Sequence, residues 1–151
     1  MNISTELQKG KAGEHLVCFD LIHKGYNAFL TDAGLPYDIV VDINGRILRI
    51  QVKSCSKKCN LGKYVKNVYN FSLRPAKSNS ITKSRKFSCK NIDYIAFVFM
   101  DIKCVQYIAA KHLCNPITGD LIQCLNFRDP CDNITNDRVL YKIGDFDYLE
   151  Q

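Results

Sequence analysis

Two short segments of alternating apolar and polar residues flank the dipeptide Asn44-Gly45. An Asn-Gly pair in this setting is the strongest short-range signal for a β-hairpin, because a type I′ turn requires positive φ at both of its central residues. The pattern therefore predicts a hairpin over residues 37–43 and 46–54, with Asn44 and Gly45 at its tip.

This register divides the hairpin into two faces and sets Asp38 opposite Gln51. One face is wholly apolar and suited to a core, and consists of Ile39, Val41, Ile43, Leu48, Ile50 and Val52. The other face is mostly polar, and consists of Asp38, Val40, Asp42, Arg49, Gln51 and Lys53. A shift of the strand register by one residue would mix the apolar and polar sets. The position of the turn and the alternation of residues therefore predict the same register. An ordinary hairpin with a solvated outer face has the same pattern, so the hairpin alone leaves its role open.

A helix is predicted over residues 4–24. Thr5 and Gln8 are spaced for a capping box, and Gly25 is a natural end. Apolar residues recur along it at Leu7, Ala12, Leu16, Phe19 and Ile22. Glu14 borders a second apolar stripe formed by Val17, Cys18 and Leu21. Gly10 and Gly13 lower helix stability, which suggests a close approach of another backbone, such as that of DNA.

The remaining pattern predicts a chain of strands and loops. Strands are expected at 27–31, 64–74, 92–100 and 104–108, with one helical turn at 109–113 and strand-like pieces at 121–127 and 139–143. Loops are expected at 55–63 and at 75–91, where Ser, Lys and Asn predominate without periodicity. The apolar run at 92–100 is typical of a buried central strand. One helix and a mixed sheet indicate an α/β (α+β) fold, and 151 residues without internal repeats indicate one domain.

Charge is distributed unevenly along the chain. Residues 51–90 contain eleven Lys or Arg and no Asp or Glu, whereas the other 111 residues contain ten basic and fifteen acidic side chains. A concentrated basic region is typical of a surface that binds a polyanion. The candidate phosphate contacts are Lys9, Lys11, Lys57, Lys58, Lys63, Lys66, Lys77, Lys83, Arg85, Lys86 and Lys90. Arg85 is the best candidate for contacting a guanine edge.

The eight cysteines and the hydropathy restrict the location of the protein. The first ten residues lack a signal-peptide core, and no apolar run is long enough for a membrane span. We therefore expect a cytoplasmic or nucleoid-associated protein with free thiols. The cysteine spacings fit no zinc template, so structural zinc is the less favoured alternative.

The polar face of the hairpin has the composition of a metal site. Directly opposed residues have Cβ atoms roughly 4.5–5.5 Å apart, so oxygens of Asp38 and Gln51 can reach one divalent cation. Lys53 lies two residues beyond Gln51 and points from the same face. An acid, an amide oxygen and an amine at one point indicate a metal-dependent phosphodiesterase.

Four positions resemble the PD-(D/E)XK nuclease superfamily: Glu14 on the first helix, Asp38, and the Gln51 and Lys53 of Gln-Val-Lys. The order Lys-Gly-Lys-Ala-Gly-Glu, Leu-Pro-Tyr-Asp-Ile-Val, Asn-Gly and Ile-Gln-Val-Lys-Ser is most similar to the bacterial group I intron homing endonucleases of that fold. The similarity covers residues 7–110, which suggests a nuclease core over about 4–110 and a C-terminal extension over 111–151. Two departures from the superfamily pattern, Gln51 for an acid and Tyr37 between Pro36 and Asp38, are shared with this branch.

The resemblance implies a restriction-endonuclease-like core and a catalytic set of Glu14, Asp38, Gln51 and Lys53. Glu14, Asp38, Gln51 and the Val52 carbonyl would hold Mg²⁺, for which Mn²⁺ is expected to substitute. The implied activity is site-specific cleavage of double-stranded DNA. One site cuts one strand, so a homodimer is expected, or the homotetramer that the resemblance implies. A Holliday-junction resolvase of the same fold and a non-catalytic DNA-binding protein are the alternatives.

Overall fold

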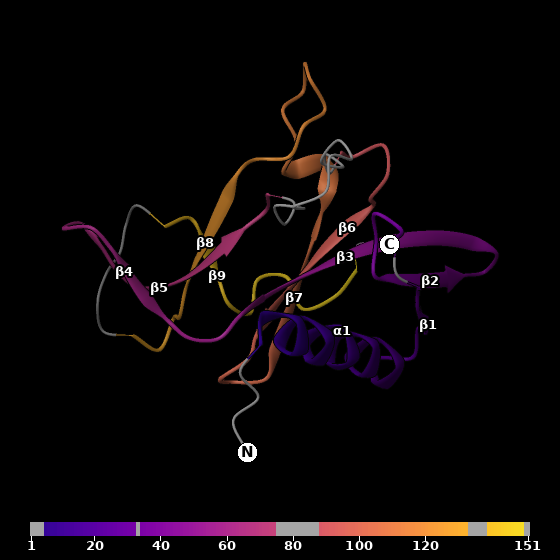
Figure 1. The fold of residues 1–151 in the computed structure, drawn as a ribbon, viewed down its shortest axis with the longest axis horizontal. Coiled ribbons are helices and arrows are strands. Elements are labelled where there is room, and N and C mark those ends of the chain that lie inside the picture. The colour runs from indigo at the N-terminus through magenta and orange to yellow at the C-terminus, as the bar shows by residue number, and fades with distance from the viewer. Residues whose placement is uncertain (1–4, 33, 75–87, 133–138, 150–151) are drawn as a thin grey trace.

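The computed structural model describes residues 5–32, 34–74, 88–132 and 139–149, and within them one helix and two sheets form the molecule (Figure 1). Helix α1 (Glu6–His23) is followed by a five-stranded sheet in the order β1-β2-β3-β6-β7. Its strands are β1 (Asn27–Leu30), β2 (Ile39–Ile43), β3 (Arg46–Cys55), β6 (Tyr94–Phe99) and β7 (Cys104–Ala109). The β3–β6 pair is parallel and the other pairs are antiparallel, so the predicted mixed sheet is confirmed.

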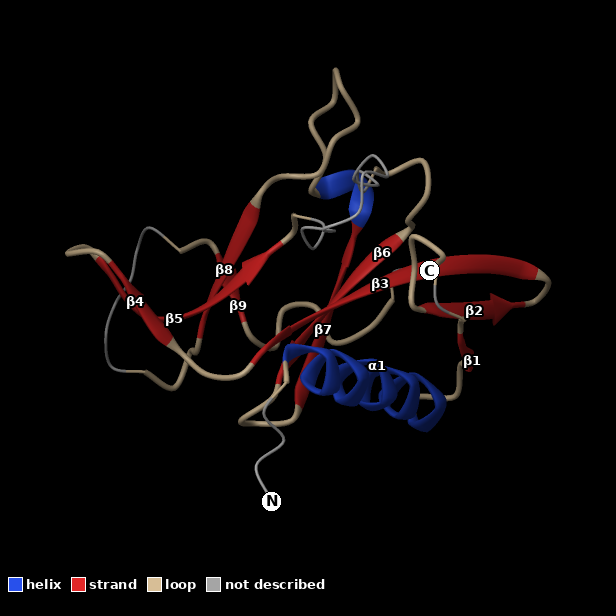
Figure 2. Ribbon diagram, viewed as in Figure 1, coloured by secondary structure: helices blue, strands red, loops and turns tan. Residues whose placement is uncertain are grey.

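A second sheet of four strands in the order β4-β5-β8-β9 lies beside the far end of β3 (Figure 2). Its strands are β4 (Cys59–Leu61), β5 (Val65–Ser72), β8 (Cys124–Arg128) and β9 (Tyr141–Lys142), and a 3-10 helix, η1 (Ala110–His112), follows β7. Strand β4 lies within 55–63, which was wrongly predicted to be a loop only. It forms because residues there pair with β5, a contact that local composition does not reveal.

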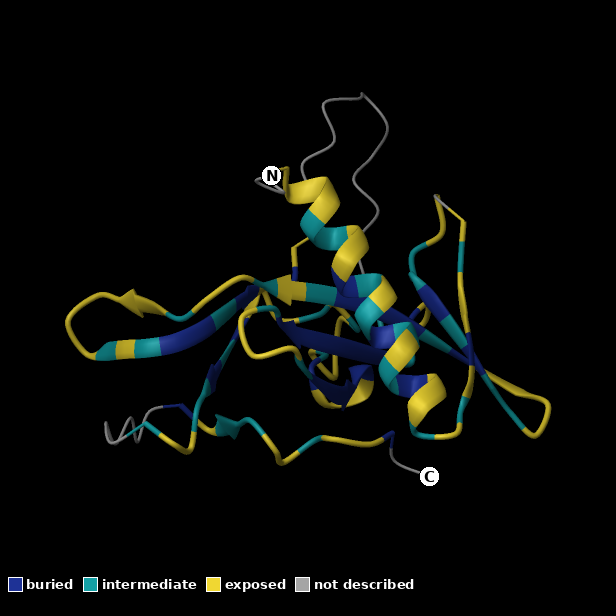
Figure 3. Ribbon diagram, turned by 90° about the horizontal axis from the view of Figure 1, so that it is seen from below, coloured by how far each residue is buried: buried dark blue, intermediate teal, exposed yellow. Residues whose placement is uncertain are grey.

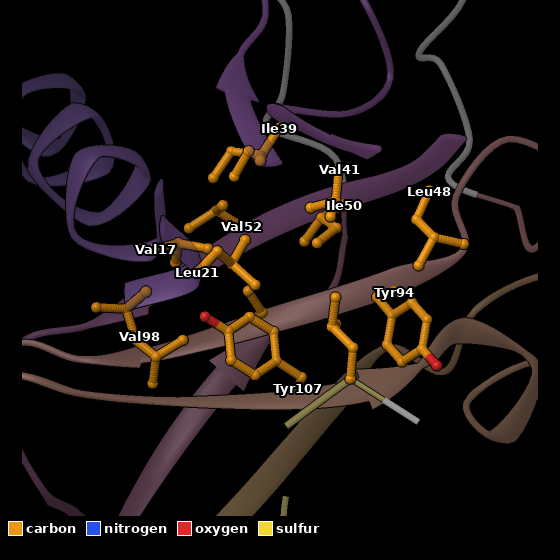
Figure 4. Packing of buried hydrophobic residues seen from close by; sticks show 14 of the residues in the cluster. Val17, Leu21, Ile39, Val41, Leu48, Ile50, Val52, Tyr94, Val98 and Tyr107 are labelled. Carbon is orange, nitrogen blue, oxygen red and sulfur yellow. The ribbon is translucent and has the colours of Figure 1, made fainter. Parts of the chain in front are cut away.

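Helix α1 and the second sheet cover opposite faces of the first sheet, so the molecule has two hydrophobic cores. On one side, Val17 and Leu21 of α1 pack with Val52, Val98 and their neighbours (Figure 4). On the other side, Phe97 and Phe99 of β6 pack with aromatic rings from β5 and β8. Every residue of β6 is buried because each face of this strand meets a different layer, which explains its uninterrupted apolar sequence. Residues beyond 110 supply β8 and β9 to the second sheet and Leu149 to the first core.

The predicted hairpin register is confirmed. Asn44 and Gly45 have φ values of 54° and 87°, as a type I′ turn requires. Ile39 pairs with Ile50, and Val41 pairs with Leu48. The Gly45 N–H also donates to the Asp42 carboxylate at 2.7 Å, which fixes the turn.

Helix α1 has the predicted Thr5 cap, and Val17 and Leu21 of the stripe beside Glu14 are buried. The Thr5 hydroxyl accepts the Gln8 N–H at 3.3 Å, and Gly25 follows the helix end with φ of 89°. Of the apolar residues that recur along the helix, Leu7, Phe19 and Ile22 are exposed, with exposed fractions of 77%, 64% and 56%. Much of the helix surface is exposed (Figure 3). The buried stripe is Gly13, Val17 and Leu21.

Gly13 explains which stripe is buried, because it lets α1 approach β3 closely. A Cβ built at Gly13 would lie 2.0 Å from Ser54 Oγ and 3.3 Å from Ser54 Cβ. The space beside this glycine is thus filled by side chains of the protein's own β3, and the suggested approach of DNA at Gly13 is corrected. A Cβ at Gly10 would contact nothing within 4 Å.

The described helices include none that is both long and apolar enough to cross a membrane. All eight cysteines lie within the described residues and are free thiols.

We predict that Gly13→Val destabilises the protein by about 1–3 kcal/mol, because the larger side chain forces α1 away from β3. Gly10→Val is the matched control: it makes the same change on the same helix in open space and should alter the unfolding free energy little. Urea unfolding followed by circular dichroism measures both. Equal effects of the two variants would contradict close packing at Gly13.

Candidate active site

The candidate site lies where β2 and β3 separate. Backbone pairing between the two strands ends with the Asp38 N–H bonded to the Ile50 carbonyl at 2.9 Å, whereas β3 continues beside β6 to Cys55. Alternate residues of a strand present their N–H and C=O groups to the same side, so those of Val52 point into the opening beside Asp38. The Asp38 carboxylate accepts the Val52 N–H at 2.8 Å and so replaces the missing strand partner.

Gln51 connects two oxygens of this opening. Its side-chain Nε2 donates to Asp38 Oδ2 at 2.6 Å and to the Val52 carbonyl at 3.3 Å. The contact between Asp38 and Gln51 that the register predicted is therefore present. Gln51 is 8% exposed, so its amide is held in place by its surroundings.

Glu14 reaches the same site from α1. It follows Gly13 directly, so the close approach of α1 to β3 also brings Glu14 towards Asp38. The Glu14 side chain is 15% exposed, and its Oε2 lies 2.6 Å from Lys11 Nζ. After burial and the Val52 N–H, the negative charge of Glu14 is the next influence on the pKa of Asp38, which it raises.

Burial perturbs both titratable groups on the hairpin. It raises the pKa of Asp38, with Glu14 acting in the same direction and the Val52 N–H, Lys53 and Lys11 acting against it. Burial lowers the pKa of Lys53, and the charge of Asp38 only partly offsets this. A cleft residue whose pKa is shifted by burial and by a specific charged partner is a candidate for acid–base chemistry.

The donors at the site fit a hard divalent cation. Asp38 and Glu14 supply carboxylate oxygens and Val52 supplies a carbonyl, all of which suit Mg²⁺ or Mn²⁺. Gln51 can join them when its amide turns to present oxygen instead of nitrogen. The described residues contain no cluster of three or more His, Cys, Asp or Glu side chains able to hold a metal. A cation held here would therefore have two charged ligands, Glu14 and Asp38, and would need neutral oxygens to complete its coordination.

Arg49, the next residue on the same face towards the hairpin tip, has a structural partner that the sequence did not indicate. Its guanidinium makes a two-pronged contact with Asp93, at 2.9 and 3.1 Å, and donates to the Lys90 carbonyl at 3.0 Å. Although burial opposes it, Arg49 holds the pKa of Asp93 below its usual range. Through these bonds Arg49 holds the end of the basic region, at Lys90, against β3. Arg49 and Asp93 are brought together only by the parallel pairing of β3 with β6.

The predicted phosphate contacts fall into three groups. Lys57, Lys63, Lys66 and Lys90 are exposed. Lys9, Lys11 and Lys58 pair with acidic side chains, and Lys58 contacts both Asp129 and Asp132 at 2.9 Å. The remaining predicted contacts, Lys77, Lys83, Arg85 and Lys86, lie outside the described residues, as does most of the predicted loop over 75–91.

Comparison with known proteins identifies the class. A family model described as PD-(D/E)XK endonuclease matches residues 4–115, so the chain belongs to the PD-(D/E)XK endonuclease family. Among solved structures, a bacterial homing endonuclease, I-Ssp6803I, is similar in fold, with a TM-score of 0.57 and 16% sequence identity. The match covers 82% of this chain and 75% of that one. No curated protein sequence matches. The family resemblance and fold class drawn from the sequence are both confirmed.

We predict that Asp38→Asn stabilises the protein near neutral pH, because it removes a buried charge and keeps an oxygen for the Val52 N–H. The pKa of Asp38 is higher in the folded than in the unfolded chain, so the wild type loses stability as pH rises through the folded value. The variant's advantage in melting temperature should be absent at low pH, grow as pH rises through the folded pKa, and stay constant above it. Melting curves across the pH range, without added metal, measure this. An increase in melting temperature that does not depend on pH would contradict a raised pKa at Asp38.

Proposed function

We propose that this protein is a metal-dependent endonuclease that cleaves double-stranded DNA at specific sites. One observation carries the proposal: in a PD-(D/E)XK family member, Asp38, Gln51 and the Val52 carbonyl converge beside Lys53, with Glu14 facing them from α1. These are oxygen donors for a cation next to an amine, the set that phosphodiester hydrolysis requires.

Each residue has a definable role in hydrolysis. The bound cation, Mg²⁺ with Mn²⁺ as a substitute, would polarise a phosphoryl oxygen and lower the pKa of water. Asp38 is held by the Val52 N–H in the orientation that a ligand needs. The burial that lowers the pKa of Lys53 makes its amine a better proton acceptor, suited to orienting or deprotonating the attacking water. In its charged form Lys53 would stabilise the negative charge that develops on the phosphate.

We further propose that the whole chain, residues 1–151, acts as one nuclease domain and assembles as a homodimer or homotetramer. One site cuts one strand, so cutting a duplex requires two copies. Exposed Lys57, Lys63, Lys66 and Lys90 would contact the phosphate backbone, and basic residues beyond the described part would add to them. The structural similarity to a protein named as a homing endonuclease supports site-specific cleavage over cleavage of branched DNA.

Cleavage assays with and without chelator test the proposal. We expect wild-type protein with Mg²⁺ to cut a pool of duplexes at defined sites. Asp38→Asn should be inactive, and Lys53→Met should lose about 10²–10⁴-fold in rate, as expected on removal of a general acid or base. Lys111→Met, an exposed lysine on η1, is the matched control and should retain activity. Cleavage restricted to four-way junctions would indicate a resolvase, and binding without cleavage on every substrate would indicate a non-catalytic protein.

The amide at Gln51 gives a separate prediction. Gln51→Glu adds a third carboxylate to the site, so half-maximal cleavage should require less Mg²⁺. Without metal, the new charge faces Asp38 and should lower the melting temperature. Rates over a range of Mg²⁺ concentrations and metal-free melting curves measure the two effects. An unchanged Mg²⁺ requirement would show that residue 51 is not a ligand.

A further inference from the structure

Two Lys–Glu pairs with the same spacing lie on α1, and they differ in their surroundings. Lys9 Nζ lies 3.0 Å from Glu6, whose side chain is 90% exposed, whereas Lys11 Nζ lies 2.6 Å from Glu14, which is 15% exposed. In the first pair the acid precedes the lysine, the order that favours a helix; in the second the order is reversed. The Lys11–Glu14 pair is therefore poorly explained as a helix-stabilising contact.

Lys11 is better explained by the charges of the active site. The hydrogen bond to Glu14 is the main cause of a raised pKa at Lys11, and the charge of Asp38 adds to it. Asp38 in turn interacts with both Lys11 and Lys53. Two carboxylates are thus balanced by two ammonium groups before any cation binds.

This balance has a cost for cation binding. A divalent cation that enters such a site adds two positive charges to a set whose charges already cancel, and it meets the Lys11 ammonium beside Glu14. Phosphate groups of DNA would supply the missing negative charge. The Lys11 side chain is exposed, so it can turn into solvent and leave Glu14 when the cation arrives.

We propose that Lys11 is a resident counter-ion that competes with the divalent cation for Glu14 and keeps the cation weakly bound until DNA is present. The inference rests on the proposed metal site and assigns a role to a residue outside the four-residue catalytic set. In the protein without metal, the positive charge of Lys11 takes the place of the cation's charge. It reduces the repulsion between Glu14 and Asp38, so the two carboxylates can stay close together.

The test is binding of Mn²⁺ alone to the full chain without DNA, followed by the electron paramagnetic resonance signal of free Mn²⁺. Lys11→Met should lower the dissociation constant on the order of three- to tenfold, because one repelling charge is removed from the site. Lys9→Met, the matched control on the same helix, should leave the dissociation constant unchanged. Circular dichroism confirms that each variant is folded.

A second arm separates failure of this inference from failure of the proposed function. Asp38→Asn should abolish Mn²⁺ binding. If it does so while Lys11→Met binds Mn²⁺ as the wild type does, the counter-ion role is wrong and the metal site stands. If Asp38→Asn binds Mn²⁺ unchanged, or if neither the wild type nor Lys11→Met binds it, the metal site itself is wrong. If Lys9→Met lowers the dissociation constant for Mn²⁺ as much as Lys11→Met does, the change reflects the net charge of the protein only, and the inference is overturned.

Discussion

The separation of β2 from β3 beyond Ile50 is the constraint on which the site depends. A strand edge left without a partner must satisfy its N–H and C=O groups elsewhere. Here the Asp38 carboxylate accepts the Val52 N–H, and the Gln51 amide donates to the Val52 carbonyl. The same unpaired edge of β3 thus orients the Asp38 carboxylate, turns the Val52 carbonyl towards the site and holds the Gln51 amide in place. A strand that continued beside β3 would use these backbone groups and leave no place for a cation.

Close packing of α1 makes this edge into a site with two carboxylates. Gly13 lets the helix approach Ser54, and the next residue, Glu14, then comes near Asp38. Burial removes water from the charged Asp38 carboxylate and Glu14 repels it, so both raise the pKa of Asp38. Both effects disfavour the charged carboxylate in the folded protein, and the positive charges of Lys53 and Lys11 partly offset them.

Elements with strong local chemistry were predictable, and those that depend on packing were not. Asn44-Gly45 fixed the hairpin register, because few residues tolerate the backbone of a type I′ turn. On α1, apolar residues recur on more than one side, so their pattern alone did not decide which side meets the sheet. A glycine contributes nothing to a hydrophobic pattern, yet Gly13 decided which stripe meets the sheet. Strand β4 was missed because its pairing with β5 is not visible in local composition.

The sequence by itself determined the hairpin, the opposition of Asp38 and Gln51, the side of β3 that carries Lys53, and the family. These follow from one turn and from the two-residue period of a strand, which are local properties. Only the tertiary structure decided the position of Glu14, the pairing of Lys11 with it, and the contact of Arg49 with Asp93. Those contacts join residues from separate elements, and their distances are set by how closely a helix and parallel strands pack.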